Sequence, residues 1–196
     1  MKKVIGITGS IGSGKSTVSN IIKEMGYQVI DCDKISHLMF NKNRKGYKEV
    51  VKEFGTIILD EKNYIDRKKL GSIIFSNEEK RHKLNQILHP LIKNEVQKEI
   101  IKSKEELVFM DCPLLFETDF HTLCDYSIVV YVDYDNQIWR VMKRDNITFP
   151  EAIRKINAQM SLDHKVSMAS YVIDNRHSIG DLNCQIKQII IQLKEK

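Results

Sequence analysis

The chain has 196 residues, of which 42% are hydrophobic and 29% charged, and its formal net charge is +5. This length fits one globular domain with room for a small inserted subdomain or lid, and no segment approaches the roughly 20 apolar residues of a membrane-spanning helix. The positive charge favours anionic ligands, but the lysines are scattered along the chain, so charge alone does not indicate nucleic acid.

The first expected element is a buried strand at Val4–Ile7, followed by the glycine-rich segment GSIGSGKS at 9–16 and a helix-like run from Thr17. Such glycines let successive N–H groups face phosphate oxygens, and the helix N-terminus adds a positive dipole end. Lys15 would reach the β- and γ-phosphates, and the Ser16 hydroxyl would ligate Mg²⁺. A glycine-rich turn that matches by chance does not explain the strand before and the helix after. The segment therefore predicts a nucleoside triphosphate site.

Four further runs are apolar at nearly every position, at 28–30, 107–110, 127–132 and 171–173. Continuous rather than alternating apolar character is typical of parallel strands covered on both faces. Helix-like stretches separate these runs, which indicates a three-layer α/β fold. The last helix is expected over 182–193, where apolar residues recur at helical spacing.

The block from 33 to 104 differs, because it is rich in Lys and Glu and contains no convincing buried strand. Asn77 predicts the start of a long helix, and His89-Pro90 predicts a kink or break within it. We expect a nucleotide-binding core at 1–32, 105–135 and 162–196, a helical substrate-binding subdomain at 33–104, and a helical lid at 136–161.

A phosphate-binding loop identifies the ligand and not the reaction. At this length a small-molecule kinase fits better than a GTPase or a motor ATPase, and such a kinase needs a group that orients or deprotonates its acceptor. Asp31 and Asp33 follow the second strand, at the sheet edge where ligands gather. Either carboxylate could bind Mg²⁺, accept a proton or cap the next helix. We expect Asp33 to take part in the reaction and Asp31 to have a structural or supporting role.

Three other charged residues are candidates for contacts with the metal or the triphosphate. Asp111 ends the third strand, where an acid often meets the metal, although an Asp-Pro junction between strand and loop is an equal alternative. Arg140 and Arg144 lie four residues apart and share a helix face, so they could neutralise charge on a triphosphate; solvated surface arginines are the alternative.

The four cysteines, at 32, 112, 124 and 184, show no C-x-x-C pair and no zinc-like spacing with histidine. Reduced, buried thiols in a cytoplasmic protein are the simplest interpretation. No basic patch interleaved with aromatic residues is present, so we expect no nucleic-acid partner. We expect a monomer, and the sequence leaves an oligomer open.

Taken together, the motifs resemble those of the dephospho-CoA kinase family. The matching segments are ITGSIGSGKST at 7–17, VIDCD at 29–33, IFSNEEK at 74–80, LNQILHPLI at 84–92, CPLLFE at 112–117 and VIDN at 172–175. They span nearly the whole chain in the order of the family. The loop alone is generic, whereas HPLI, PLLFE and the D-x-D pair together are specific.

The resemblance implies a P-loop NTPase fold with an inserted helical substrate-binding subdomain and a helical lid. It implies transfer of the ATP γ-phosphoryl group to the ribose 3′-hydroxyl of dephospho-CoA, with Mg²⁺. Asp33 would be the general base, assisted by Lys15 and the lid arginines Arg140 and Arg144. The implied ATP-binding residues are Gly9, Gly12, Ser13, Gly14, Lys15, Ser16, Thr17 and Asn175, with Ser16 on the metal. The implied acceptor-binding residues are Asp33, Arg67, His89, Pro90, Pro113, Leu114, Phe116 and Glu117.

The chain departs from the family pattern at two lid positions, where Lys155 and Lys165 stand in place of arginines. Lysine keeps the charge but loses the bidentate fork, so a lid role for either residue is left open. Another small-molecule or nucleoside monophosphate kinase, with the same loop and lid, is the main alternative function. A nucleotide-dependent nucleic-acid-binding protein is a more distant one.

Overall fold

The computed structural model describes residues 2–75 and 77–195, so Ser76, within the matching segment 74–80, lies outside the described residues. The chain forms two compact units. The first comprises the residues up to Ile30 and those from Ser103 onward, and the second is Asp31–Lys102. Each unit is described by itself below.

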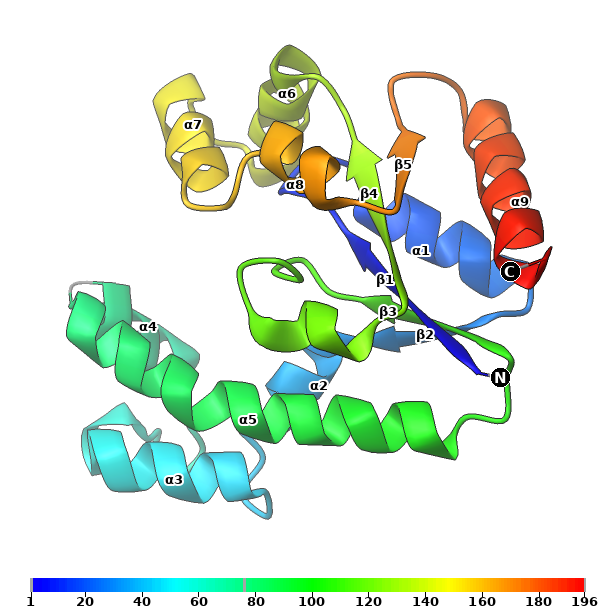
Figure 1. Ribbon diagram of the computed structural model, residues 1–196. Helices are drawn as coiled ribbons and strands as arrows, with labels where there is room; N and C mark the ends of the chain where they lie inside the picture. Colours follow the sequence, from blue (N-terminus) through cyan, green and yellow to red (C-terminus); the bar gives the residue numbers. More distant parts are fainter. Residues whose placement is uncertain (1, 76, 196) are drawn as a thin grey trace. The chain divides into compact units, whose positions relative to one another are not determined.

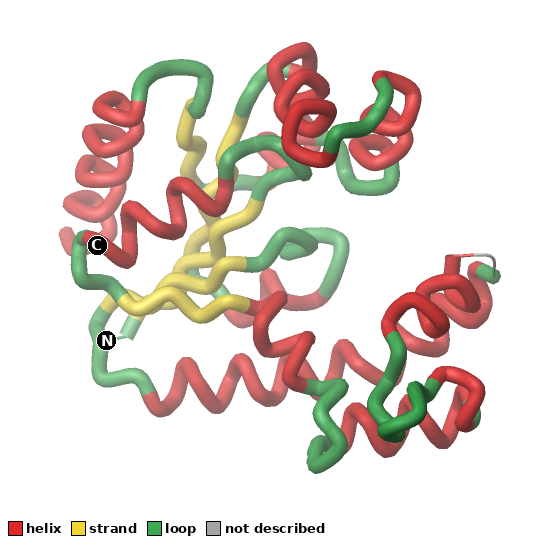
Figure 2. Tube along the Cα trace, turned by 180° about the vertical axis from the view of Figure 1, so that it is seen from behind, coloured by secondary structure: helices red, strands yellow, loops and turns green. Residues whose placement is uncertain are grey.

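The sheet has five strands among the described residues: β1 (Lys3–Thr8), β2 (Gln28–Asp31), β3 (Leu107–Asp111), β4 (Tyr126–Tyr131) and β5 (Tyr171–Asp174). Their order is β2-β3-β1-β4-β5, and β1 pairs in parallel with both β3 and β4, as β4 does with β5 (Figures 1 and 2). All five apolar runs of the sequence are strands. With the glycine loop between β1 and the first helix, this is the predicted P-loop NTPase fold.

One face of the sheet is covered by α1 (Lys15–Glu24) and α9 (Ile179–Glu195). The apolar stripe expected at the C-terminus is present, and it packs on alternate strand residues. The buried side chains of this layer include Ile5, Ile7, Phe109, Ile128 and Ile173 from the strands and Leu182, Ile186, Ile189, Ile190 and Leu193 from α9. Alternate strand positions thus form the main core.

The other face is covered by the segment after β3, which contains the 3₁₀ helix η2 (Asp119–Leu123), and by α8 (Leu162–Met168). Leu115 is fully buried, and its Cδ2 atom lies 2.7 Å from where a Cβ on Gly6 would stand. Leu162 of α8 packs on Val129 and Val132. The predicted three layers are therefore present within the first unit.

The predicted lid segment folds as a helical hairpin of α6 (Tyr134–Asp145) and α7 (Phe149–Asn157). Asp133 caps α6, and Thr148 with Glu151 forms a capping box at the start of α7. The two helices share a small apolar cluster, to which Ile11 of the glycine loop contributes its side chain. This segment belongs to the first compact unit.

The cysteines are all free, as expected, but they are not all buried. Cys32 and Cys112 are buried, Cys124 is half-buried, and Cys184 is exposed. Burial raises the pKa of the Cys124 thiol to about 12. The prediction of buried thiols is wrong for Cys184, because α9 turns its apolar stripe inward and leaves that position on the solvent side.

The second unit is helical: α2 (Cys32–Leu38), α3 (Lys45–Phe54), α4 (Arg67–Phe75) and α5 (Glu78–Lys102), with a short 3₁₀ helix, η1 (Thr56–Ile58). The long helix α5 is its axis, since α2, α3 and α4 all contact it. The amide N–H of Lys80 donates to the Asn77 side chain at 3.0 Å, which confirms the predicted helix start.

Of the kink or break expected at His89-Pro90, the break is absent, because α5 continues through Pro90. Proline removes one i→i−4 hydrogen bond. The helix continues because Leu84, Leu88, Ile92 and Val96 are buried at every fourth position, so packing along one face outweighs the missing bond. Among the described residues, α5 included, no helix is long and apolar enough to cross a membrane.

Replacing Gly6 by alanine tests the packing between β1 and the segment after β3. The added methyl group would lie 2.7 Å from Leu115 Cδ2 and 2.9 Å from Cys124 Sγ, so we expect the free energy of unfolding to fall by about 1–3 kcal/mol. Gly180→Ala, in α9 of the same unit and near only the Ser178 hydroxyl, is the control and should be neutral or slightly stabilising. Equal urea midpoints for the two variants would contradict this packing.

Candidate functional site

The glycine loop at 9–16 joins the end of β1 to the start of α1. Gly12 and Gly14 have φ angles of 80° and 90°, in the left-handed region that side chains with a Cβ disfavour. Gly14 is the N-cap of α1. The N–H groups of the first turn have no carbonyl partner within the helix, so this end of α1 can donate to an anion.

The surroundings of the loop also require glycine. A Cβ on Gly12 would lie 2.8 Å from Val141 Cγ2 and 2.9 Å from the Gln137 carbonyl oxygen, both on α6. A Cβ on Gly14 would collide with the Asn175 side-chain amide. The loop is thus enclosed by α6 and by the residues after β5, and these contacts keep it curled.

Lys15 forms an ion pair with Asp111 at the end of β3. The other oxygen of Asp111 accepts from the Ser19 hydroxyl at 2.7 Å, one turn further along α1. The side chains of Lys15 and Asp111 are only 18% and 12% exposed, so the pair is largely shielded from water. The sequence left Asp111 evenly balanced between a metal-region and a structural role. Its contact with Lys15 places it next to the glycine loop.

Asn175, predicted as an ATP-binding residue, is buried beneath the loop. Its side-chain amide donates to the Ser13 carbonyl at 2.7 Å, and its own carbonyl accepts from Arg140 Nη2 at 2.9 Å. Asn175 therefore supports the loop backbone and connects it to a lid-segment arginine.

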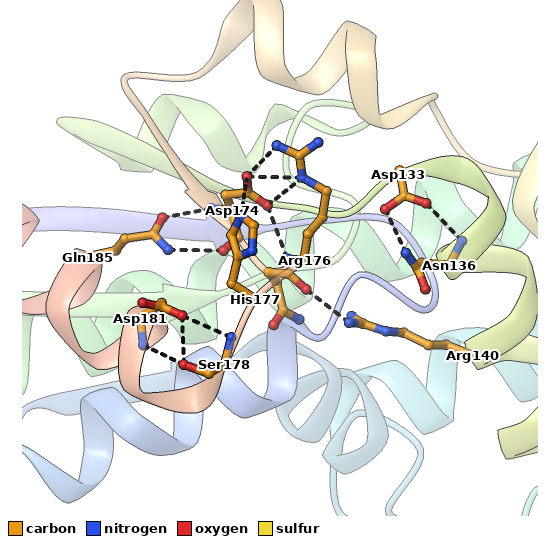
Figure 3. Close-up of polar contacts among 10 residues, drawn as sticks. Asp133, Asn136, Arg140, Asp174, Arg176, His177, Ser178, Asp181 and Gln185 are labelled. Atoms are coloured by element: carbon orange, nitrogen blue, oxygen red, sulfur yellow. Dashed lines mark hydrogen bonds and ion pairs between the residues drawn. The ribbon is translucent and has the colours of Figure 1, made fainter.

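Arg140 and Arg144 share α6 but have different partners. Arg140 is directed toward the turn after β5 (Figure 3). Arg144 instead donates twice to Asp145, whose carboxylate also accepts from Lys155 at 2.7 Å. The Arg144 guanidinium, with a smaller contribution from Lys155, holds the pKa of Asp145 well below its usual range. Only Arg140 is placed beside the loop.

The turn between β5 and α9 is held by a dense set of polar contacts (Figure 3). Arg176 pairs with Asp174 at 2.6 Å, which lowers the pKa of Asp174, and its guanidinium lies 5.6 Å from the centre of the Tyr131 ring. Gln185 of α9 bonds both the N–H and the carbonyl of Asp174. The segment carrying Asn175 is therefore rigidly anchored on both sides.

The predicted acceptor residues at 113–117 are largely engaged with the rest of the first unit. Lys165, fully buried on α8, donates to the Pro113 carbonyl at 2.8 Å and pairs with Glu117 at 2.8 Å. Glu117 also accepts from the Met160 N–H, and Phe116 packs against the cluster around Val129. Leu114 is 40% exposed. The lysine at 165 thus anchors this segment rather than standing on the surface.

The remaining predicted residues lie in the second unit. Asp31 caps α2 by accepting from the Lys34 N–H at 2.9 Å, as expected for its structural role. Asp33 is exposed in the first turn of α2. Arg67 starts α4 with its guanidinium 5.8 Å from the centre of the Phe40 ring, and His89 is half-buried on α5.

A pocket of about 380 Å³ lies within the second unit, between α3 and α5. Pro90, predicted to bind the acceptor, is one of its lining residues, together with Lys45 and Asn94. The lining also includes the acidic Glu49 and the apolar Ile87 and Leu91, so the pocket combines side chains of both charges with an apolar surface.

Sequence reasoning missed Gln137 and Gln159, whose side chains bond the backbone of the loop. Gln159 is the glutamine of the R-I-x-x-Q lid pattern of the family that the chain resembles, a signal that could have found it, whereas Gln137 has no such signal because a glutamine on a helix face is ordinarily solvated. Their contacts arise only when the segments 134–159 and 9–16 fold together.

The side chains around the glycine loop offer few ligands for a metal ion. Among the residues described, no group of three or more His, Cys, Asp or Glu side chains converges on one point. Mg²⁺ typically takes one or two protein ligands and completes its shell with phosphate oxygens and water. Ser16 is exposed on the first turn of α1, next to Lys15 and its partner Asp111. A single hydroxyl ligand of this kind fits a Mg²⁺ ion that arrives already bound to a nucleotide.

The comparisons with known proteins agree with this geometry. The family model for dephospho-CoA kinase matches residues 3–181. The chain is 42% identical to a dephospho-CoA kinase of Oceanobacillus iheyensis over 193 residues, covering 97% of both chains. It is similar to the solved structure of dephospho-CoA kinase from Campylobacter jejuni, with a TM-score of 0.74, 29% identity and coverage of 100% and 98% of the two chains. It is also similar to the crystal structure of TT1252 from Thermus thermophilus, with a TM-score of 0.85, 30% identity and 98% of both chains covered.

Removing the partner of the buried lysine tests the anchor of segment 113–117. Glu117→Gln leaves the Lys165 charge in a site with no exposure, so we expect a loss of about 3 kcal/mol in unfolding free energy. Lys165→Met should cost less, about 1–2 kcal/mol, because the Glu117 side chain is 19% exposed and can be hydrated.

The matched control is Glu99→Gln, which removes an exposed ion pair with Lys102 on α5 and should change stability by less than about 0.5 kcal/mol. Urea unfolding measures all three variants. A Glu117→Gln variant as stable as the control would show that Lys165 does not depend on this carboxylate.

Proposed function

The chain belongs to the dephospho-CoA kinase family, and from this membership we propose how its residues carry out the reaction. It is an ATP-dependent kinase that transfers the γ-phosphoryl group of ATP to the ribose 3′-hydroxyl of dephospho-CoA, giving CoA and ADP. The observation that carries this conclusion is the match of family and fold over nearly the whole chain, with a complete phosphate-binding loop. The residue roles that follow are our proposals.

We propose that the loop residues Gly12–Thr17, with Gly9, bind the ATP phosphates through backbone N–H groups. Lys15 would shift from Asp111 toward the β- and γ-phosphates, since phosphate oxygens offer a stronger anionic partner. Asn175 supports this loop through its bond to the Ser13 carbonyl and would lie near the adenine of ATP. Arg140, anchored on the Asn175 carbonyl, is placed to neutralise charge that develops during transfer.

Arg144 would act after its release from Asp145. Its guanidinium is bound to a carboxylate within α6, so a phosphate must compete with that pairing. Lys155 pairs with the same carboxylate and would keep Asp145 neutralised when Arg144 leaves. This gives Lys155 a supporting role in the lid in place of a direct contact with phosphate.

Mg²⁺ is proposed as the metal, bound by Ser16 and by the nucleotide. When bound, the ion would neutralise phosphate charge and orient the transferred group. Ser16 is exposed on the first turn of α1, where its hydroxyl can reach such an ion. Asp111 would act indirectly: its carboxylate, held by the Ser19 hydroxyl, would keep the Lys15 ammonium group beside the loop.

Asp33 is proposed as the group that accepts the proton of the ribose 3′-hydroxyl. It is exposed in the first turn of α2, whereas Asp31 is occupied as the cap of that helix. The acceptor would be bound by Arg67, His89 and Pro90 of the second unit. In the segment after β3, Leu114 is exposed and would offer an apolar contact. Pro113 and Glu117 would shape the segment through Lys165, and Phe116 through its packing near Val129.

The wider organisation is also proposed. The domains are a core at 1–32, 105–135 and 162–196, a substrate-binding subdomain at 33–104 and a lid at 136–161. We propose that the protein acts in the cytoplasm as a monomer and without a nucleic-acid partner.

The function is tested by a coupled assay of ADP release with ATP and dephospho-CoA, run in parallel with AMP, CMP and shikimate as acceptors. We expect turnover with dephospho-CoA at least about 10²-fold above any other acceptor, because a site built for one polar substrate rejects those that leave its groups unpaired. Turnover with another acceptor and none with dephospho-CoA would establish a different small-molecule kinase.

The proposed base is tested by Asp33→Asn, which keeps the size of the side chain and removes its basicity. We expect kcat to fall by about 10²–10⁴, toward the low end because phosphoryl transfer depends mostly on positioning, while ATP affinity is retained. Asp31→Ala is the control: it removes a helix cap and should cost about 1 kcal/mol of stability with little change in kcat. A near-normal kcat in Asp33→Asn would assign the proton to another group, with Asp111 next to be tested.

A further inference from the structure

Ile11, at the apex of the phosphate-binding loop, is held through its backbone by two glutamines of the lid segment. Gln137 Nε2, on α6, donates to the Ile11 carbonyl at 2.7 Å. Gln159 Oε1, in the turn after α7, accepts from the Ile11 N–H at 2.8 Å and from the Ser10 hydroxyl at 3.0 Å. We call these contacts the Ile11 clamp. They fix the two peptide planes on either side of Ile11.

The side chain of Ile11 strengthens the same attachment. It packs against the apolar cluster of the α6–α7 hairpin, formed by Ile138, Val141, Ala152 and Ile156. The next residue, Gly12, leaves no space for a Cβ against Val141. The apex of the loop is therefore built into the hairpin, and its conformation is set by contacts from outside the loop.

The polarity of the clamp follows from the backbone. A carbonyl only accepts and an N–H only donates, so Gln137 must present its amide nitrogen and Gln159 its amide oxygen. The two glutamines have opposite roles although they are chemically identical. This asymmetry distinguishes the clamp from two side chains that merely fill space.

We propose that Gln137 and Gln159 are positioning residues for phosphoryl transfer. The N–H groups that receive phosphate begin directly after Ile11, so the plane of the peptide between Ile11 and Gly12 sets the direction in which the following groups point. A small rotation of that plane misplaces them, and catalysis by a preorganised site is sensitive to such errors. The proposal rests on the function given above, since it assigns the clamp to the ATP side of the same reaction.

The surroundings permit the substitutions that test this proposal. A pocket of about 390 Å³ borders the clamp, and its lining includes Gln137, Gln159, Tyr131, Tyr134 and Asn157. Although Gln137 is only 2% exposed, both glutamines thus border open space, which can accept a methionine of similar length.

The experiment compares methionine and glutamate at each position, with equilibrium binding of ADP to the intact protein as the first readout. Gln137→Met and Gln159→Met each remove a hydrogen bond, and we expect ADP binding to weaken about tenfold. Gln159→Glu keeps the acceptor oxygen and should stay within about threefold of wild type. Gln137→Glu replaces the donor by an acceptor facing a carbonyl and should be at least as weak as Gln137→Met.

The two glutamate variants carry the same added charge, but Gln137 is more deeply buried than Gln159. Gln137→Met, which adds no charge, is therefore the reference for the hydrogen bond at position 137. Binding is measured at about pH 8.5 to keep the introduced carboxyl groups ionised. Gln192→Glu, on the exposed side of α9, is the control and should bind ADP as wild type does. Thermal unfolding of each variant checks that the protein tested is folded.

Amide hydrogen exchange supplies a second readout, because it reports directly on the bond that Gln159 accepts from the Ile11 N–H. Exchange at the Ile11 N–H should accelerate in Gln159→Met and remain slow in Gln159→Glu. Equal loss of ADP affinity in the two glutamate variants, or loss in Gln159→Glu matching that in Gln159→Met, would overturn the proposal. If Gln137→Met does not fold, the pair of variants at 159 decides alone. Because ADP binding needs no acceptor, the outcome is independent of whether wild type uses dephospho-CoA.

Discussion

The first unit depends on keeping a short backbone loop curled so that its N–H groups point inward. Such a loop is unfavourable by itself, because it brings the positive ends of several N–H dipoles close together and requires positive φ angles at Gly12 and Gly14. It persists because both ends are fixed: β1 is buried between two layers, and α1 is packed on the sheet beside α9. The space around the loop is then filled by Val141 and Asn175, so that no other curvature fits.

The lysine and arginine side chains of a polyphosphate site must also be stabilised when no phosphate is bound. Lys15 is paired with Asp111, Arg144 with Asp145 and Arg176 with Asp174, whereas Arg140 donates to the Asn175 carbonyl. These pairs lower the free energy of the ligand-free protein and at the same time fix where the cations lie. An incoming phosphate therefore exchanges one anionic partner for another, without leaving a cation unpaired in a shielded place.

The parts that the sequence predicts are those encoded locally. Continuous apolar runs give the five strands, the glycine pattern gives the loop, and Asn77 gives the start of α5, because each depends on residues within one turn or strand.

The parts that the sequence does not predict depend on tertiary contacts. Pro90 does not break α5, since burial along one face compensates for the lost bond. Lys165 looks like a surface charge until α8 packs beside Glu117, and Gln137 and Gln159 acquire partners more than a hundred residues away.

One face of α6 connects these features. Gln137, Arg140 and Val141 lie within one turn and all reach the loop or the residue beneath it: the first bonds Ile11, the second bonds the Asn175 carbonyl, and the third packs on Gly12. Two polar contacts and one apolar contact fix the position of α6 relative to the loop and its rotation about its own axis. The Arg140 guanidinium is thereby located relative to the loop by the same contacts that shape the loop. Arg144, one turn further along, lies beyond them and is held by Asp145 instead. The hairpin cannot move as a separate lid without either carrying the loop apex with it or breaking the bonds to Ile11.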